Sequence, residues 1–99
     1  MTIKMSRNGN MLLVRLEGRL DTTTAPELEE KLLSSLEGIS ELKLDMEKLE
    51  YISSAGLRTL IAARKTMDKP AAMTVIRPCD VVMEVFEVTG FADILNFEE

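Results

Sequence analysis

Hydrophobic and polar positions alternate along the start of the chain and then change to a helical spacing. The alternation over Met1–Met5 and Met11–Glu17 predicts two strands, and the Asn-Gly pair within Arg7–Asn10 predicts a hairpin turn between them. Gly18–Asp21 is expected to leave the sheet. The sequence therefore predicts that the fold begins with an antiparallel hairpin.

A first helix is predicted after this hairpin from three signals. Leucines recur at intervals of four, a threonine and a glutamate fit a capping box with proline in the first turn, and a glycine follows as a stop. These residues are Leu28, Leu32 and Leu36; Thr24, Glu27 and Pro26; and Gly38. The helix is expected to carry its leucines toward a sheet.

The rest of the chain continues this alternation of strands and helices. The expected elements are a strand over Glu41–Met46, a helix over Ser54–Met67 ended by Lys69-Pro70, a last strand over Ala72–Ile76, and a helix over Val81–Thr89 between Asp80 as N-cap and Gly90 as stop. Phe91, Ile94, Leu95 and Phe97 form an apolar tail expected to pack on the core. The order β-β-α-β-α-β-α predicts an α/β fold with a mixed sheet, as a single domain over residues 1–99.

This order has a geometric consequence. The second and third strands are joined through a helix, so they run parallel and their carboxyl ends lie at one edge of the sheet. The loop Asp21–Thr24 leaves the first of these ends, and the loop Glu47–Ser54 leaves the second. Partners and ligands of open α/β sheets usually bind at such an edge. We therefore expect Asp21, the three threonines, Ser53 and Ser54 to share one face.

Composition narrows the classes of function. The net charge of −5 argues against nucleic acid or an anionic membrane as the main partner, because both attract clustered Lys and Arg. The chain has no apolar run near the roughly 20 residues of a membrane span and no signal-peptide pattern. A lone cysteine, Cys79, fits a reducing compartment. These features predict a cytoplasmic protein with no direct membrane insertion.

The sequence contains no histidine, which removes the commonest general base and the usual zinc ligands. Neither GxxxxGK[ST] nor GxGxxG occurs, so no phosphate-binding loop is readable. The scattered carboxylates form no persuasive catalytic group. We therefore expect no enzyme activity and no cofactor, and a function based on binding.

Two stretches resemble the STAS domain family of bacterial anti-sigma factor antagonists. Gly18–Ala25 matches the family's G-x-L-D-x-x-T-A turn, and Asp45–Leu57 matches its D-x-x-x-[hydrophobic]-x-x-[hydrophobic]-D-S-[ST]-G-L element. A weaker match covers Val85–Phe91. The matches span almost the whole chain at the expected spacing, so the resemblance implies the STAS fold.

The resemblance also implies a regulatory switch. Such antagonists bind a serine kinase that doubles as an anti-sigma factor; the kinase phosphorylates a serine that corresponds to Ser54, and a metal-dependent serine phosphatase restores it. Ser53 ranks below Ser54 as the phosphorylated position. The candidate partner-binding surface, from the shared edge and the resemblance together, comprises Asp21, Thr22, Thr23, Thr24, Ser53, Ser54, Ala55, Gly56, Leu57 and Arg58.

Other interpretations of these residues stay open. Ser53 or Ser54 could simply cap the helix, contributing roughly 1 kcal/mol. Asp21 could cap or turn the loop before the first helix, or it could hold the magnesium or orient the serine hydroxyl when a kinase docks. Ser53 and Ala55 replace the family's usual Asp and Ser/Thr, which suits a constitutive adaptor subunit without a phosphorylation cycle. A small-ligand or nucleotide-binding sensor at the Asp21/Ser54 edge is a third possibility.

Overall fold

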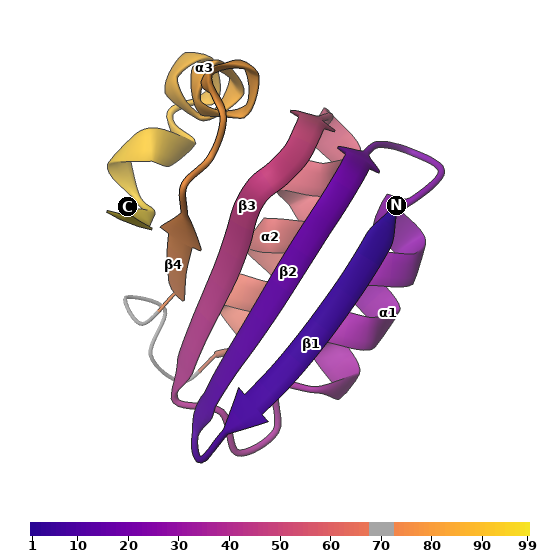
Figure 1. The fold of residues 1–99 in the computed structure, drawn as a ribbon, viewed down its shortest axis with the longest axis vertical. Coiled ribbons are helices and arrows are strands. Elements are labelled where there is room, and N and C mark those ends of the chain that lie inside the picture. The colour runs from indigo at the N-terminus through magenta and orange to yellow at the C-terminus, as the bar shows by residue number, and fades with distance from the viewer. Residues whose placement is uncertain (68–72) are drawn as a thin grey trace.

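The strands form one mixed five-stranded sheet with the spatial order β1-β2-β3-β4-β5 (Figure 1). The computed structural model describes residues 1–67 and 73–99. β1 and β2 pair antiparallel, and each later strand runs parallel to its neighbour. The strands are β1 (Thr2–Asn8), β2 (Met11–Leu20), β3 (Glu41–Ile52), β4 (Met73–Ile76) and β5 (Asn96–Glu98).

The helices cover only one face of β1, β2 and β3. In Figure 1, α1 (Ala25–Ser34) and α2 (Ser54–Thr66) lie behind these strands, whose face toward the viewer they leave open. α3 (Asp80–Thr89) lies beyond the carboxyl end of β4, and the 3-10 turn η2 (Phe91–Asp93) leads back to β5. No helix among residues 1–67 and 73–99 is long and apolar enough to cross a bilayer.

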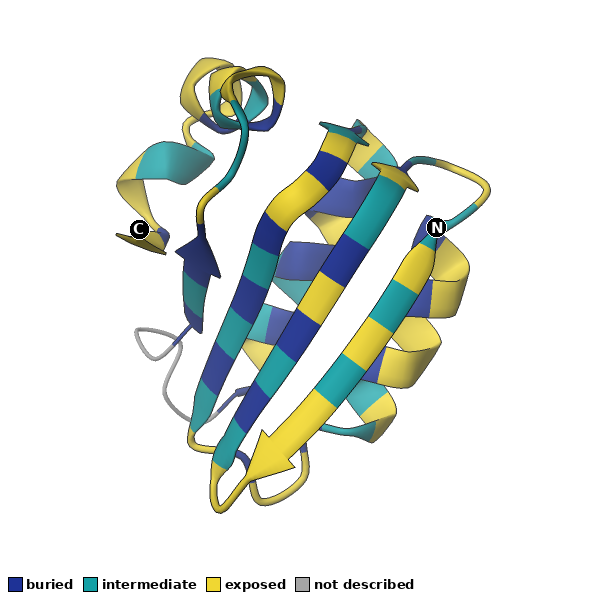
Figure 2. Cartoon of the chain, viewed as in Figure 1, coloured by how far each residue is buried: buried dark blue, intermediate teal, exposed yellow. Residues whose placement is uncertain are grey.

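The alternating pattern determines which face of each strand is buried. Leu12, Val14 and Leu16 on β2 are at most 3% exposed, while Arg15 between them is exposed. Figure 2 shows buried residues alternating with intermediate or exposed ones along β2 and β3. The leucines of α1 and α2 complete the core, and burying each apolar side chain stabilises the fold by about 1.5–3 kcal/mol. The predicted class and element order are confirmed.

Strands β2 and β3 are longer than predicted. The expectation that Gly18–Asp21 leaves the sheet was wrong, because β2 continues to Leu20, and β3 continues past Met46 to Ile52. The pairing between them is shifted by irregularities near residues 15–17 and 18–19. Such bulges break the two-residue period on which the sequence reading depended.

Strand β4 is not the last strand. β5 follows it in parallel pairing, with Asn96 opposite Thr74. β5 has only three residues, all exposed, so it carries no alternating pattern that could have been read. The tail packs back in part as predicted: Leu95 is buried, Phe91 packs against the core, and the Phe97 ring centroid lies 6.0 Å from that of Phe86. The prediction was wrong for Ile94, which is 47% exposed. The predicted helix stop at Lys69-Pro70 and the strand start at Ala72 lie outside the described residues.

Several predicted helix ends were displaced. Thr24 precedes α1 but its side chain makes no capping hydrogen bond, so the capping box was wrong. α1 ends at Ser34, before Gly38. Cys79, not Asp80, occupies the N-cap of α3, while Gly90 ends that helix in the left-handed conformation, as predicted. α2 ends at Thr66, one residue earlier than predicted.

Candidate functional site

The carboxyl ends of β2 and β3 lie side by side, as the sequence predicted. Leu20 and Ile52 are register partners in the parallel ladder. The N–H of Ser53 donates to the carbonyl oxygen of Leu20 at 2.9 Å, which joins the two loops that follow these strands. Figure 1 shows the loop after β2 and the start of α2 at the same end of the sheet. Residues 21–24 and 53–58 are called the edge site below.

Asp21 organises its own loop. Its Oδ1 accepts hydrogen bonds from the Thr23 hydroxyl at 2.7 Å, from the Thr23 N–H at 3.0 Å and from the Thr24 N–H at 3.2 Å. The hydrogen bond from the Thr23 hydroxyl is the main reason that the pKa of Asp21 lies below its usual value. The loop-forming role considered for Asp21 is therefore present in the structure.

Thr24 closes the same loop with its side chain. Its hydroxyl donates to the Arg19 carbonyl oxygen at 2.9 Å and accepts from the Asp21 N–H at 2.8 Å. This hydroxyl points back to β2 instead of forward to the amides of α1, which explains why no capping box forms. Thr22 and Thr23 are exposed, so the loop presents two threonines to solvent.

The two serines have different positions at the start of α2. Ser53 is the N-cap, with extended backbone, and its Oγ accepts from the Gly56 N–H at 3.5 Å. Ser54 is the first helical residue and is exposed. Within the described part of the chain, the Ser54 hydroxyl has no hydrogen-bond partner. The capping role falls to Ser53, and the Ser54 hydroxyl is open to solvent.

Gly56 allows α2 to approach the sheet. A Cβ atom on Gly56 would lie 2.7 Å from Cγ of Leu20 and 2.8 Å from Cγ1 of Ile52, closer than real contacts allow. Leu57 is 5% exposed, and Ala55 packs partly against the core. The small residue after the serines therefore serves helix–sheet packing inside the domain, and Gly56 and Leu57 present little surface to a partner.

A residue pair that the sequence analysis missed lies on β2 and β3, just before the edge site. The Arg19 guanidinium lies 4.5 Å from the centroid of the Tyr51 ring, a cation–π geometry. Arg19 is two residues before Asp21, and Tyr51 is two residues before Ser53. Because the two residues are equally far along the sequence from loops that share one edge, the sequence could have indicated that they pair. Arg58 is exposed one helical turn after Ser54.

No group of three or more His, Cys, Asp or Glu residues in the described ranges is arranged to hold a metal ion. At the edge site, Asp21 is the one carboxylate among residues 21–24 and 53–58. The polar side chains of the edge site are hydroxyls, one carboxylate and the Arg58 guanidinium, and Arg19 lies beside the site on β2. These groups suit recognition of a polar surface.

Known proteins similar in sequence to this chain are named as anti-sigma factor antagonists. BtrV of Bordetella bronchiseptica, assigned by its name to the anti-sigma factor antagonists, is 34% identical over 98 residues, covering 95% of this chain and 83% of the relative. The anti-sigma-B factor antagonist of Bacillus subtilis is 25% identical over 95 residues, covering 95% and 87%.

Solved structures show the same fold. The unphosphorylated form of the anti-sigma factor antagonist SpoIIAA superposes with a TM-score of 0.85 at 16% identity, covering 99% of this chain and 89% of that one. SpoIIAA of Bacillus in its phosphorylated form gives a TM-score of 0.75 at 15% identity, covering 99% and 92%. The STAS domain family matches residues 2–99. This chain belongs to the STAS domain family.

Proposed function

We propose that this protein is a cytoplasmic anti-sigma factor antagonist, which binds a serine kinase that acts as an anti-sigma factor and is released when that kinase phosphorylates Ser54. The names of its relatives support the class of function. Ser54 is chosen as the phosphorylated residue because the two serines have different structural roles. Ser53 caps α2, so the exposed Ser54 hydroxyl can be modified without loss of the cap.

The position of Ser54 suits a phosphate physically. A phosphoserine carries about −1.5 to −2 charges at neutral pH. At the first residue of α2 this charge would face unpaired backbone N–H groups and the positive end of the helix dipole. Arg58, one turn later, is exposed and free to approach it. The domain is therefore expected to stay folded after phosphorylation.

Phosphorylation of Ser54 is expected to weaken the binding of the partner kinase. A kinase surface that covers the edge site would have to bury the new charge at a site that already contains the Asp21 carboxylate. Leaving a buried charge unpaired costs several kcal/mol, which corresponds to a loss of affinity of about a hundredfold or more. A phosphatase would find the same position accessible and restore binding.

A capture experiment tests this proposal. The wild-type protein, Ser54→Ala and Ser54→Asp would be used as baits in native lysate, with capture read by mass spectrometry. We expect a serine kinase on the wild-type and Ala baits and its loss from the Asp bait. Ser34→Asp is the matched control, because Ser34 is exposed at the far end of α1, and it should retain the kinase.

Other outcomes identify the rival functions. Equal recovery of a transport or signalling component on all four baits would contradict the switch and indicate a constitutive adaptor. Recovery of no protein, together with a thermal shift on addition of a nucleotide or metabolite, would indicate a ligand sensor. Incubation of the captured kinase with ATP should place phosphate on Ser54, and phosphate on Ser53 instead would refute the assignment of the residue.

A further inference from the structure

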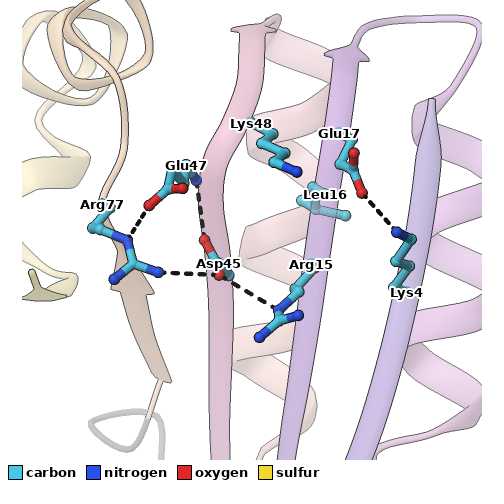
Figure 3. Close-up of a pocket in the computed structure, with 8 residues that line it drawn as sticks. All are labelled: Lys4, Arg15, Leu16, Glu17, Asp45, Glu47, Lys48 and Arg77. Carbon is cyan, nitrogen blue, oxygen red and sulfur yellow. Dashed lines mark hydrogen bonds and ion pairs between the residues drawn. The ribbon is translucent and has the colours of Figure 1, made fainter.

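A charged hollow lies on the open face of the sheet, separate from the edge site. It has a volume of about 250 Å³, and Figure 3 shows side chains from β1, β2, β3 and the segment after β4 around it. Its lining residues are Lys4, Arg15, Leu16, Glu17, Asp45, Glu47, Lys48 and Arg77. This group is called the open-face hollow.

Asp45 anchors the centre of the open-face hollow. Its side chain is only 13% exposed, and its Oδ1 accepts a hydrogen bond from the Glu47 N–H at 3.1 Å. Its Oδ2 lies 3.6 Å from Nε of Arg15 and 3.5 Å from Nη2 of Arg77. One carboxylate therefore contacts two guanidinium groups, one from β2 and one from the segment after β4, as Figure 3 shows.

Arg77 is fixed by its backbone as well as by its side chain. Its φ of 46° lies in the left-handed region, which is unfavourable for a side chain of this kind. Its N–H donates to the Glu98 carbonyl oxygen at 2.9 Å, and its Nε lies 2.6 Å from Oε2 of Glu47. The guanidinium is thus held over the hollow before any ligand arrives, which lowers the entropic cost of binding.

The open-face hollow has a positive balance in an acidic protein. Four cations and three carboxylates line it, giving a net charge of +1, whereas the whole chain carries −5. Lys48 has no ion-pair partner among residues 1–67 and 73–99, and the Nη groups of Arg15 make none of the contacts that hold its Nε. Guanidinium donors left unpaired in this way match the oxygens of an oxyanion.

We propose that the open-face hollow binds a small phosphate dianion, either inorganic phosphate or a phosphate monoester. Arg15 and Arg77 would donate to the phosphate oxygens, and Lys48 would supply the unpaired charge. The volume leaves room beside the phosphate for a few further atoms of a monoester. This site is independent of the phosphorylation proposed for Ser54, which lies at the end of the sheet.

Titration of the ¹⁵N-labelled protein with inorganic phosphate, followed by amide chemical shifts at constant ionic strength, tests the site. We expect saturable shifts in the residues around the hollow, and no such shifts with chloride. Arg15→Gln should weaken binding by about tenfold, the loss expected for a charge-assisted hydrogen bond. Lys48→Gln should weaken it severalfold, and Lys65→Gln, an exposed lysine on α2, should leave it unchanged.

The same spectra contain the results that would overturn the site. Shifts confined to the first turn of α2 and lost in Arg58→Gln would mean that the helix N-terminus binds the anion instead. Equal responses to chloride, or equal losses in Lys48→Gln and Lys65→Gln, would mean charge screening only. Lys48 makes no ion pair within residues 1–67 and 73–99, so Lys48→Gln keeps the test valid if Arg15→Gln unfolds. Glycerol 3-phosphate binding more tightly than phosphate would identify a monoester as the ligand, and equal binding would identify inorganic phosphate.

Discussion

The edge site and the open-face hollow use the same two strands, β2 and β3, but are built in different ways. The edge site is held by backbone hydrogen bonds, a serine cap and the close approach of Gly56 to Leu20 and Ile52. The hollow is held by ion pairs between side chains that are mostly exposed, such as Arg15 and Arg77 on Asp45. Close packing gives one fixed geometry, whereas exposed ion pairs are weak and depend on salt. The edge therefore suits a defined protein surface and the hollow suits a small charged ligand.

Among the substitutions considered, Gly56→Ala should disturb the packing at the edge site most and give the largest loss in the free energy of unfolding. The new Cβ would collide with Leu20 and Ile52, which forces α2 away from the sheet. We expect a loss of about 1–3 kcal/mol in the free energy of unfolding, the usual cost of overpacking, although alanine favours helix more than glycine does. Urea unfolding measures it, with Ser34→Ala on α1 as control. An unchanged or raised stability would show that the contact is not tight.

The backbone of the hollow is tested by a pair of substitutions at Arg77. Both Arg77→Ala and Arg77→Gly remove the ion pairs to Asp45 and Glu47, but only glycine accepts a φ of 46° without strain. Arg77→Gly should therefore be more stable than Arg77→Ala by about 1 kcal/mol in thermal unfolding. The reverse order would mean that the left-handed conformation contributes no strain at this position.

The division of labour between the serines predicts a smaller difference. Ser53→Ala removes the cap of α2 and should cost about 0.5–1 kcal/mol, at the low end because its hydrogen bond to the Gly56 N–H is 3.5 Å long. Ser54→Ala should change stability by less than about 0.5 kcal/mol, as for an exposed residue without partners. Paired urea titrations distinguish the two. Equal losses would show that both hydroxyls support the helix.

The smallest effect concerns the pH dependence of the Asp21 loop. The folded-state pKa of Asp21 lies below its unfolded value of 3.8, so this carboxylate stabilises the fold fully above that value. Its contribution is lost as the pH falls from about 3.8 through the folded-state pKa. Asp21→Asn should thus be less stable than wild type at neutral pH, and the difference should shrink in acid. A difference that is constant with pH would exclude this linkage.

Local patterns were enough to predict most of the fold. Alternation and the Asn-Gly turn predicted the hairpin, and the leucines at intervals of four predicted α1. The parallel course of the second and third strands predicted that Asp21 and Ser53 share one edge, and the hydrogen bond from the Ser53 N–H to the Leu20 carbonyl oxygen confirms it. Strand β5 was missed because its pairing depends on β4, which lies twenty residues earlier, and not on any pattern of its own.

The open-face hollow could not be predicted from the chain. Arg15, Asp45 and Arg77 come from three separate segments, and their meeting depends on the register of the sheet. Arg15 pairs with Asp45, and Asp45 with Ile76, the residue before Arg77, and this pairing is not written in any one segment. The left-handed backbone of Arg77 was equally hidden, because arginine seldom adopts it. Tertiary pairing, not local propensity, brings these side chains together.

The separate positions of Ser53 and Ser54 also bear on how long the protein persists in a cell. Proteases cut mainly the small population of opened molecules, so lifetime follows the free energy of unfolding. Under the proposed function, phosphate on Ser54 leaves the cap on Ser53 and the packing of Gly56 in place. Modified and unmodified molecules would then be cleared at equal rates. The total amount of the protein would then not change with phosphorylation, and only the phosphorylated fraction would report the signal.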